Sequence, residues 1–367
     1  MKILAPFDTV VEVSHIIKAG ADELYCGLNT DYCRKKYFFS NARRMFYGNL
    51  GSFRELEGAI AIARKHTTPV FLCANGYLAQ GAFVYSLKEI SRAIEIGIDG
   101  VIIADISLIP FIKKEKVNCK IILSTLNPCF NSLGLEFYKD MGIDRVTLPI
   151  NQMALEEIER ICLDANRLNL ELEVFANNVT CRNIPGYCLY HDFLDGPLYK
   201  NAYRTGIRLT LKALKLASKL MPVSLKGKFG RHLFASRVHP MPCRREYEFE
   251  EFEKSEKGFI TKEKEKTYSL DRDFAQSYCG LCALYCFEKY GITAGKIAGR
   301  GYPTARKAKD VMFARRYLDK IKNGQASDDN FVCRGMEIYE DIYENNCRNK
   351  RCHYERINEI KQAVQGR

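Results

Sequence analysis

Short apolar runs alternate with longer amphipathic segments through the first half of the chain. The apolar runs predict β-strands at 2–5, 23–26, 70–74, 100–104, 120–124, 145–148 and 172–176. The segments between them repeat apolar residues at helical spacing and predict helices at 52–65, 86–96, 129–141 and 154–168. An eighth run at 294–298 lies between helical patterns around 283–290 and at 304–322. Eight strand–helix units predict parallel strands closed into a TIM-type (β/α)8 barrel.

An open doubly wound α/β sheet is the alternative fold, but the first strand is not followed by the Gly-rich turn typical of it. The alternation of predicted strands and helices is interrupted between the seventh and eighth strands. The pattern therefore divides the chain into barrel strands 1–7 at 1–180, a Cys-rich basic insertion at 181–290, the last strand and helix at 291–322, and a Cys-containing tail at 323–367.

Chemistry in such a barrel lies where the strands end at their carboxyl side. Asn177 and Asn178 follow the seventh strand, and Arg300 follows the eighth. These positions make the three residues candidates for substrate binding. The same amide side chains also suit an ordinary polar loop.

The bulk composition is that of a globular protein, with 47% hydrophobic and 27% charged residues. No stretch reaches the roughly 18 apolar residues of a membrane span. The apolar start before Asp8 is too short for a signal peptide. We therefore expect a cytoplasmic protein without a transmembrane segment.

The 15 cysteines are unusual for a reducing compartment, where structural disulfides are rare. Metal ligation is the physical alternative, although a few of these thiols will be plain core residues. The insertion contains six of them, at Cys181, Cys188, Cys243, Cys279, Cys282 and Cys286. Thiolates of this kind bind an iron–sulfur cluster or, as the alternative, zinc.

The tail contains three further cysteines, and its last pair is followed by a histidine. Cys347 and Cys352 are separated by four residues, His353 follows, and Cys333 lies upstream. These residues predict either a second metal site or unliganded thiols at an exposed, basic helix end.

The net charge of +12 is concentrated in residues 196–245, which contain twelve Lys or Arg and no Asp or Glu. Arg204, Arg208 and Lys212 recur at intervals of four, which places them on one helical face. A phosphate backbone is the natural partner of such a strip, so we expect RNA. An anionic membrane surface, an acidic partner protein or a solvated face are the alternatives.

Several motifs resemble the peptidase U32, or collagenase-like, family. The most specific is Glu173-Val-Phe-Ala-Asn-Asn-Val-Thr-Cys181, followed by Gly186-Tyr-Cys188. Leu4-Ala5-Pro6, Pro242-Cys243-Arg244 and Lys296-Ile-Ala-Gly-Arg300 are similar as well. The resemblance covers most of residues 1–320.

The resemblance implies oxygen-independent hydroxylation, since well-studied members of this family modify a ribosomal or transfer RNA base or a ubiquinone precursor. It implies a 4Fe-4S cluster on Cys181, Cys188, Cys243 and Cys279, with Cys282 competing for the fourth position. Some members take the hydroxyl group from prephenate. Arg300 would hold this anionic donor through a bidentate pair.

We therefore expect an oxygen-independent hydroxylase that acts on tRNA or rRNA. The alternatives are hydroxylation of a quinone precursor, a U32-type peptidase and a metal-stabilised binding module. A partner protein or a homo-oligomer is possible as well. The peptidase alternative is not supported by residues, because the chain lacks Gly-x-Ser-x-Gly and His-Glu-x-x-His.

Overall fold

The chain folds into two compact units, one formed by Met1–Gly186 with Ser277–Arg367 and the other by Tyr187–Gln276. The structure is a computed structural model. It describes residues 1–30, 48–76, 78, 80–114, 119–149, 153–177, 246–255, 258–269, 279–344, 347 and 352–365.

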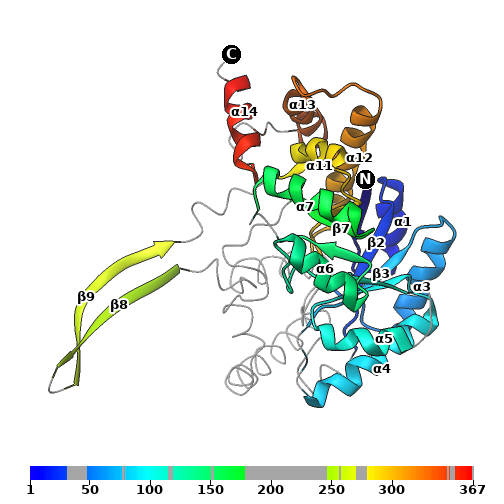
Figure 1. Cartoon of the computed structure of the whole chain (residues 1–367), viewed down its shortest axis with the longest axis horizontal. Coiled ribbons are helices and arrows are strands. Elements are labelled where there is room, and N and C mark those ends of the chain that lie inside the picture. Colours follow the sequence, from blue (N-terminus) through cyan, green and yellow to red (C-terminus); the bar gives the residue numbers. More distant parts are fainter. Residues whose placement is uncertain are drawn as a thin grey trace, which may run out of the picture. The chain divides into compact units, whose positions relative to one another are not determined.

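The first unit contains a closed barrel of eight parallel strands in the order β1-β10-β7-β6-β5-β4-β3-β2. Figure 1 shows strands β2, β3 and β7 of this barrel among the helices of the unit. The strands are β1 Lys2–Pro6, β2 Glu23–Gly27, β3 Val70–Ala74, β4 Gly100–Ile103, β5 Lys120–Leu123, β6 Arg145–Thr147, β7 Glu171–Asn177 and β10 Ala294–Ile297. Closure comes from β10, which pairs with β1 on one side and with β7 on the other. The predicted TIM-type barrel is thus confirmed, and the open sheet was the wrong alternative.

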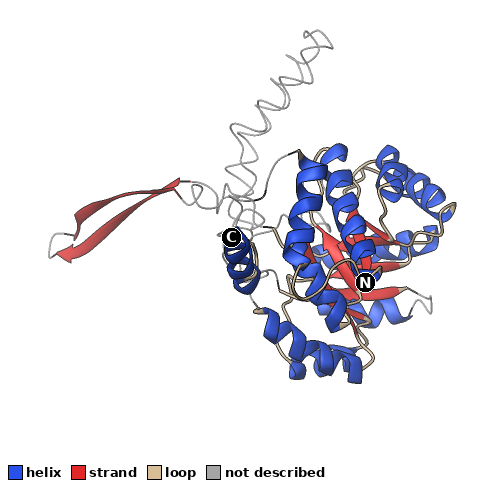
Figure 2. Ribbon diagram, turned by 90° about the horizontal axis from the view of Figure 1, so that it is seen from above, coloured by secondary structure: helices blue, strands red, loops and turns tan. Residues whose placement is uncertain are grey.

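Helices surround the strands, as the view in Figure 2 shows. Those of the barrel are α1 Val10–Lys18, α3 Phe53–Arg64, α4 Gln80–Ile96, α5 Ile109–Lys114, α6 Ser132–Met141, α7 Leu155–Arg167, α11 Leu284–Tyr290 and α12 Thr304–Lys322, with short 3-10 turns η1 Ile106–Leu108 and η3 Leu281–Ala283. Two more helices, α13 Phe331–Tyr343 and α14 Glu355–Gln365, follow in the tail. None of the helices among these residues is long and apolar enough to cross a membrane.

Local capping explains where several predicted helices begin and end. The Ser52 side chain accepts a hydrogen bond from the backbone N–H of Glu55 and starts α3. Asn131 does the same for Gly134, so α6 begins three residues later than the apolar pattern predicted. Gly142 ends α6 with a positive φ of 90°, a conformation that glycine adopts without strain.

The barrel interior is divided between apolar and charged side chains. Its apolar part is a cluster formed by Leu4, Tyr25, Phe71, Cys73, Ile102 and Ile122. Residues that alternate with these along the strands, such as Ile3, Leu24 and Leu72, belong instead to the larger core that also contains the buried helix residues.

A buried ion network occupies the interior near the amino ends of the strands. The Arg145 guanidinium, which is fully buried, donates to Glu23 at 2.6 Å and to Glu171 at 2.7 Å. Glu173 accepts from Lys296 at 2.7 Å and from the Thr147 hydroxyl at 3.0 Å. Because every charge here has an opposite partner, the network can remain ionised away from water.

The network carries an expected pH dependence. Burial alone would raise the pKa of Glu23, but the hydrogen bond and charge of Arg145, together with Lys2, bring the pKa below its usual 4.5. Burial is likewise outweighed at Glu171 by Lys120 and Arg145, and at Glu12 by Lys307 and Thr304, so the pKa of each is also lowered. These carboxylates bind protons less readily in the folded chain than in the unfolded one.

We therefore expect the free energy of unfolding to lose these contributions as the pH falls below the usual carboxyl pKa and through the lower folded values. Above that pKa the contributions are fully present. Urea unfolding followed by circular dichroism from about pH 7 down to about pH 3 measures the effect. In Glu171→Gln, the free energy of unfolding should fall less steeply as the pH is lowered. A urea midpoint of unfolding that does not change with pH in the wild type would contradict the expectation.

In the second unit the structure describes a two-stranded antiparallel sheet, β8 Glu246–Ser255 and β9 Gly258–Ser269. The register pairs Glu246 with Ser269 at one end and Ser255 with Gly258 at the other. The sequence did not predict this hairpin. The predicted domain boundaries remain predictions.

Candidate functional site

The carboxyl ends of the barrel strands bring polar side chains to one end of the barrel, which we call the mouth. They follow strands that are far apart in the sequence. The residues are Asp8 after β1, Asn29 and Thr30 after β2, Asn75 after β3, Asp105 after β4, Ser124 and Asn127 after β5, Asn177 at the end of β7 and Arg300 after β10. This is the end at which barrel enzymes bind their substrates.

Arg300 lies in a tightly fixed loop after β10. Its side chain is 7% exposed and donates from Nη1 to Asn49 Oδ1 at 3.1 Å. Gly299 and Gly301 on either side have positive φ angles of 140° and 85°. A Cβ on Gly48 would lie 2.9 Å from the Gly301 nitrogen, so residue 48 must be small for the two loops to approach. The guanidinium is thus a positioned cation at the mouth.

Two carboxylates and a lysine secure this loop to the start of the chain. Lys307 is fully buried and donates to Asp8 at 2.7 Å and to Glu12 at 2.8 Å. Asp8 also accepts from the Gly301 N–H at 2.5 Å, and Glu12 accepts from the Thr304 hydroxyl at 2.6 Å. The loop that carries Arg300 is therefore held on both sides by charged hydrogen bonds.

Asn177 is fully buried at the carboxyl end of β7. Within the described part of the chain, neither its amide oxygen nor its amide nitrogen has a hydrogen-bond partner. A buried amide in this state is costly in a purely structural role. Its donor and acceptor suit the recognition of a bound polar group.

Four cysteines surround one small cavity beside the mouth. Cys279 and Cys282 come from the start of the segment that leads into α11, and Cys347 and Cys352 come from the connection between α13 and α14. The cavity has a volume of about 20 Å³ and is otherwise lined by Phe313, Val332, Gly335, Met336, Tyr339 and Lys361. Burial, and then the neighbouring Cys279, Cys352 and Cys347, raise the pKa of Cys282 well above its usual value.

The backbone joins these cysteines to each other and to the mouth. Cys279 forms an isolated parallel bridge with Cys352 and an antiparallel bridge with Asn177. The His353 N–H donates to the Cys279 carbonyl at 3.0 Å. The tail is thereby fixed at the carboxyl end of β7.

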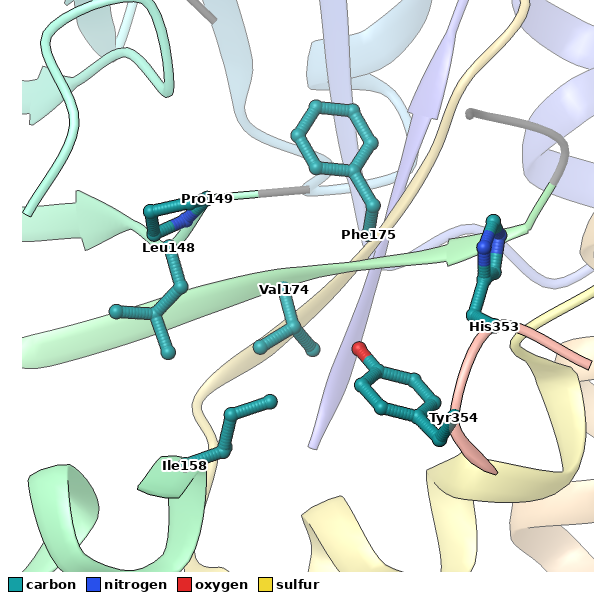
Figure 3. Close-up of a pocket in the computed structure, with 7 residues that line it drawn as sticks. All are labelled: Leu148, Pro149, Ile158, Val174, Phe175, His353 and Tyr354. Atoms are coloured by element: carbon teal, nitrogen blue, oxygen red, sulfur yellow. The ribbon is translucent and has the colours of Figure 1, made fainter. Parts of the chain in front are cut away.

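Figure 3 shows the same junction from a second, smaller cavity of about 10 Å³. Val174 and Phe175 lie on opposite sides of β7, while His353 and Tyr354 approach the end of the strand from the tail. Burial lowers the pKa of His353 to about 4, so its ring is neutral at pH 7. Arg356 in α14 also pairs with Glu156 in α7 at 3.2 Å.

The residues predicted from the sequence fall into two groups. Asn177, Arg300 and Cys279 are described, and the structure places Cys279 and Asn177 side by side in the backbone bridge. The others lie outside the described residues, namely Asn178, Cys181, Cys188, Arg204, Arg208, Lys212 and Cys243. One ligand alone does not test the fit of the predicted 4Fe-4S cluster.

Sequence reasoning missed the grouping of Cys279 and Cys282 with the tail pair. The two short spacings were a usable signal for it. It also missed Lys361, because the pattern of hydrophobic and polar residues gives no sign that this lysine is buried beside the sulfurs. Cys333, proposed from the sequence as part of a tail site, does not line the cavity.

Comparison with known proteins gives relatives of the barrel region. The tRNA hydroxylation protein P of Escherichia coli (strain K12) is 25% identical over 195 residues, which cover 53% of this chain and 40% of that protein. The tRNA hydroxylation protein P1 of Bacillus subtilis (strain 168) is 24% identical over 189 residues, covering 51% and 41%. An uncharacterized protease of Methanocaldococcus jannaschii is 25% identical over 202 residues, covering 53% and 45%. The chain thus matches less than half the length of each.

A solved structure, that of the U32 peptidase Mk0906, aligns with 53% of this chain and 75% of its own at 14% identity and a TM-score of 0.41. The model of peptidase family U32 matches residues 8–205, which include strands β2 to β7. The match extends over more than half of the 367 residues. The chain belongs to peptidase family U32.

Proposed function

We propose that this protein is an enzyme that hydroxylates a base of tRNA. The observation that carries the proposal is the similarity of the barrel region to tRNA hydroxylation proteins from two bacteria. The arrangement at the mouth supports it. A fixed cation at Arg300 and a buried amide at Asn177 offer the two kinds of group needed to bind an anion and a polar base.

In this proposal Arg300 binds an anionic hydroxyl donor, such as the carboxylate groups of prephenate. Asn177 orients the reacting group through its amide donor and acceptor. The basic strip that contains Arg204, Arg208 and Lys212 contacts the phosphates of the RNA, where binding releases counterions.

The cofactor proposed is a 4Fe-4S cluster on Cys181, Cys188, Cys243 and a fourth ligand, for which the sequence favours Cys279. When bound, such a cluster supplies one-electron chemistry. The support is the cysteine spacing that resembles other U32 proteins. Cys279 also lines the small cavity with Cys282, Cys347 and Cys352, so it could belong to a second ligand set formed by those residues. The metal content of cysteine variants distinguishes the two sets.

A peptidase has less support from the described residues. His15 lies on α1 and His66 follows the end of α3, so both lie away from the strand ends that form the mouth. The Nδ1 atom of His15 lies 3.0 Å from the Val11 carbonyl oxygen of the same helix. His353 lies beside the mouth but is buried, with its pKa lowered to about 4 by that burial. A base that activates a nucleophile needs a pKa nearer the working pH.

Mass spectrometry of nucleosides from the tRNA of a strain without this gene tests the proposal. We expect one hydroxylated nucleoside to disappear and to return with the wild-type gene. A gene with Arg300→Met should restore little of this nucleoside. We expect the rate of hydroxylation to be lower by about 100-fold or more, because the substitution removes the positioned cation. Arg92→Met, on an exposed part of α4, is the matched control and should restore it fully. An unchanged nucleoside profile in the deletion strain would refute the function.

A further inference from the structure

We propose that Cys279, Cys282, Cys347 and Cys352 bind a single structural Zn²⁺ ion, at a site separate from the iron–sulfur cluster. The site shares Cys279 with the ligand set favoured for the cluster, so a zinc ion here assigns Cys279 to the zinc and leaves the fourth position of the cluster to another ligand. Its readout is the zinc content of the protein.

The four cysteines form two closely spaced pairs from distant segments, as the ligands of structural zinc sites do. Two residues separate Cys279 from Cys282, and four separate Cys347 from Cys352. Paired cysteines at two-to-four-residue spacing, brought together from distant segments, are the usual ligands of closed tetrahedral zinc sites. The bridge between Cys279 and Cys352 joins the two pairs through the backbone.

The cavity between the four cysteines is small. Its volume of about 20 Å³ is enough for one water-sized body, since a water needs roughly 10–15 Å³, and a single metal ion is of that size. Gly335 also limits the site, because a Cβ there would lie 2.5 Å from the Cys282 sulfur.

The surroundings provide the charge that a tetrathiolate site requires. Four thiolates and one Zn²⁺ carry a formal charge of −2, which is costly to bury without a cation nearby. Lys361 is 3% exposed, lines the cavity and donates to the Cys347 carbonyl. Its ammonium therefore lies where it offsets the charge of the loaded site.

Zinc binding requires the four cysteine side chains to turn toward one point in the cavity that they line. Among the residues that the structure describes, no group of three or more possible ligands is already arranged to hold a metal. The backbone that carries Cys279 and Cys352 is in place through its bridge.

A zinc ion here would fix the tail to the mouth of the barrel. Cys279 is bridged to Asn177, and His353 follows Cys352 at the end of β7. The ion would therefore hold the tail against the strand end that carries the candidate substrate-binding amide. Its role is structural, because all four coordination positions are taken by sulfur.

Metal analysis of the full-length protein, purified without oxygen, tests the site. We expect one zinc per chain in the wild type, and loss of that zinc in Cys279→Ala, Cys282→Ala, Cys347→Ala and Cys352→Ala. Cys333→Ala, on the neighbouring helix α13, is the matched control and should keep its zinc. Iron is measured in the same samples. Cys181→Ala should lose any iron and keep the zinc, so failure of the cluster and failure of the zinc site are distinguishable.

A second measurement does not depend on whether the variants fold. Replacement of zinc by Co²⁺ in the wild-type protein should give the visible absorption and the sulfur-to-metal charge-transfer bands of a tetrahedral thiolate site. Wild-type protein without zinc and without these bands would overturn the proposal. So would a Cys279→Ala variant that loses iron but retains its zinc, since Cys279 would then be a cluster ligand.

Discussion

Replacing Arg145 with Met is expected to lower the free energy of unfolding by about 3–5 kcal/mol. The guanidinium is fully buried and pairs with Glu23, Glu171 and Glu173. Its removal leaves the buried Glu23 and Glu173 carboxylates with less positive charge to balance them, while Glu171 keeps Lys120 as a partner. Urea unfolding at pH 7, followed by circular dichroism, measures the change.

Two further variants separate this charge effect from a loss of packing. Arg92→Met removes an exposed ion pair with Glu95 and should change stability by no more than about 0.5 kcal/mol. Adding Glu23→Gln to Arg145→Met removes one of the unbalanced charges and should recover part of the loss. A loss below about 1 kcal/mol in Arg145→Met would show that the network contributes little.

The second large effect is expected for Lys307→Met, again about 3–5 kcal/mol. Lys307 is fully buried between Asp8 and Glu12, so its removal places two carboxylates together without their shared cation. The same contacts hold the loop of Arg300. If the protein has the tRNA-hydroxylating activity proposed above, the yield of the modified nucleoside should fall further than the loss of soluble protein explains, and a comparison of the two measures this.

Lys309→Met is the matched control in the same helix. Lys309 is partly exposed and pairs with Glu344 at 3.5 Å, so its loss should have little effect on stability. Glu12→Gln combined with Lys307→Met should restore part of the stability. If the double variant were no more stable than Lys307→Met, charge imbalance would not be the cause.

The barrel was predictable because parallel strands are buried on both sides and appear as continuous apolar runs. Val70–Ala74 was predicted with its bounds unchanged, and β10 differs by one residue. The charged interior was not predicted. Glu23, Arg145 and Glu171 begin their strands, where a polar residue also marks an ordinary strand boundary, and only the closed barrel shows that they converge.

The candidate site was predictable where a single element defines it. Asn177 and Arg300 follow predicted strands, so the topology alone brings them to the mouth. The cysteine cavity depends on two segments that meet only because the tail returns to the end of β7, through the Cys279–Cys352 bridge. Spacing within each pair reveals a ligand-like motif, but not which pairs share a metal. The roles of Asn177, Arg300 and the cluster cysteines stay predictions.

The pairing of β10 with both β1 and β7 has a consequence for biosynthesis. The first strand pairs with β2 and the seventh with β6 on one side, but on the other side residues 2–4 and 173–177 pair with residues 294–297. Until the ribosome has released that segment, both strands present unpaired backbone edges, which are templates for aggregation. The nascent chain must also accommodate the whole intervening second unit before closure. We therefore expect slow maturation of the barrel and a strong dependence on chaperones while the chain is being made.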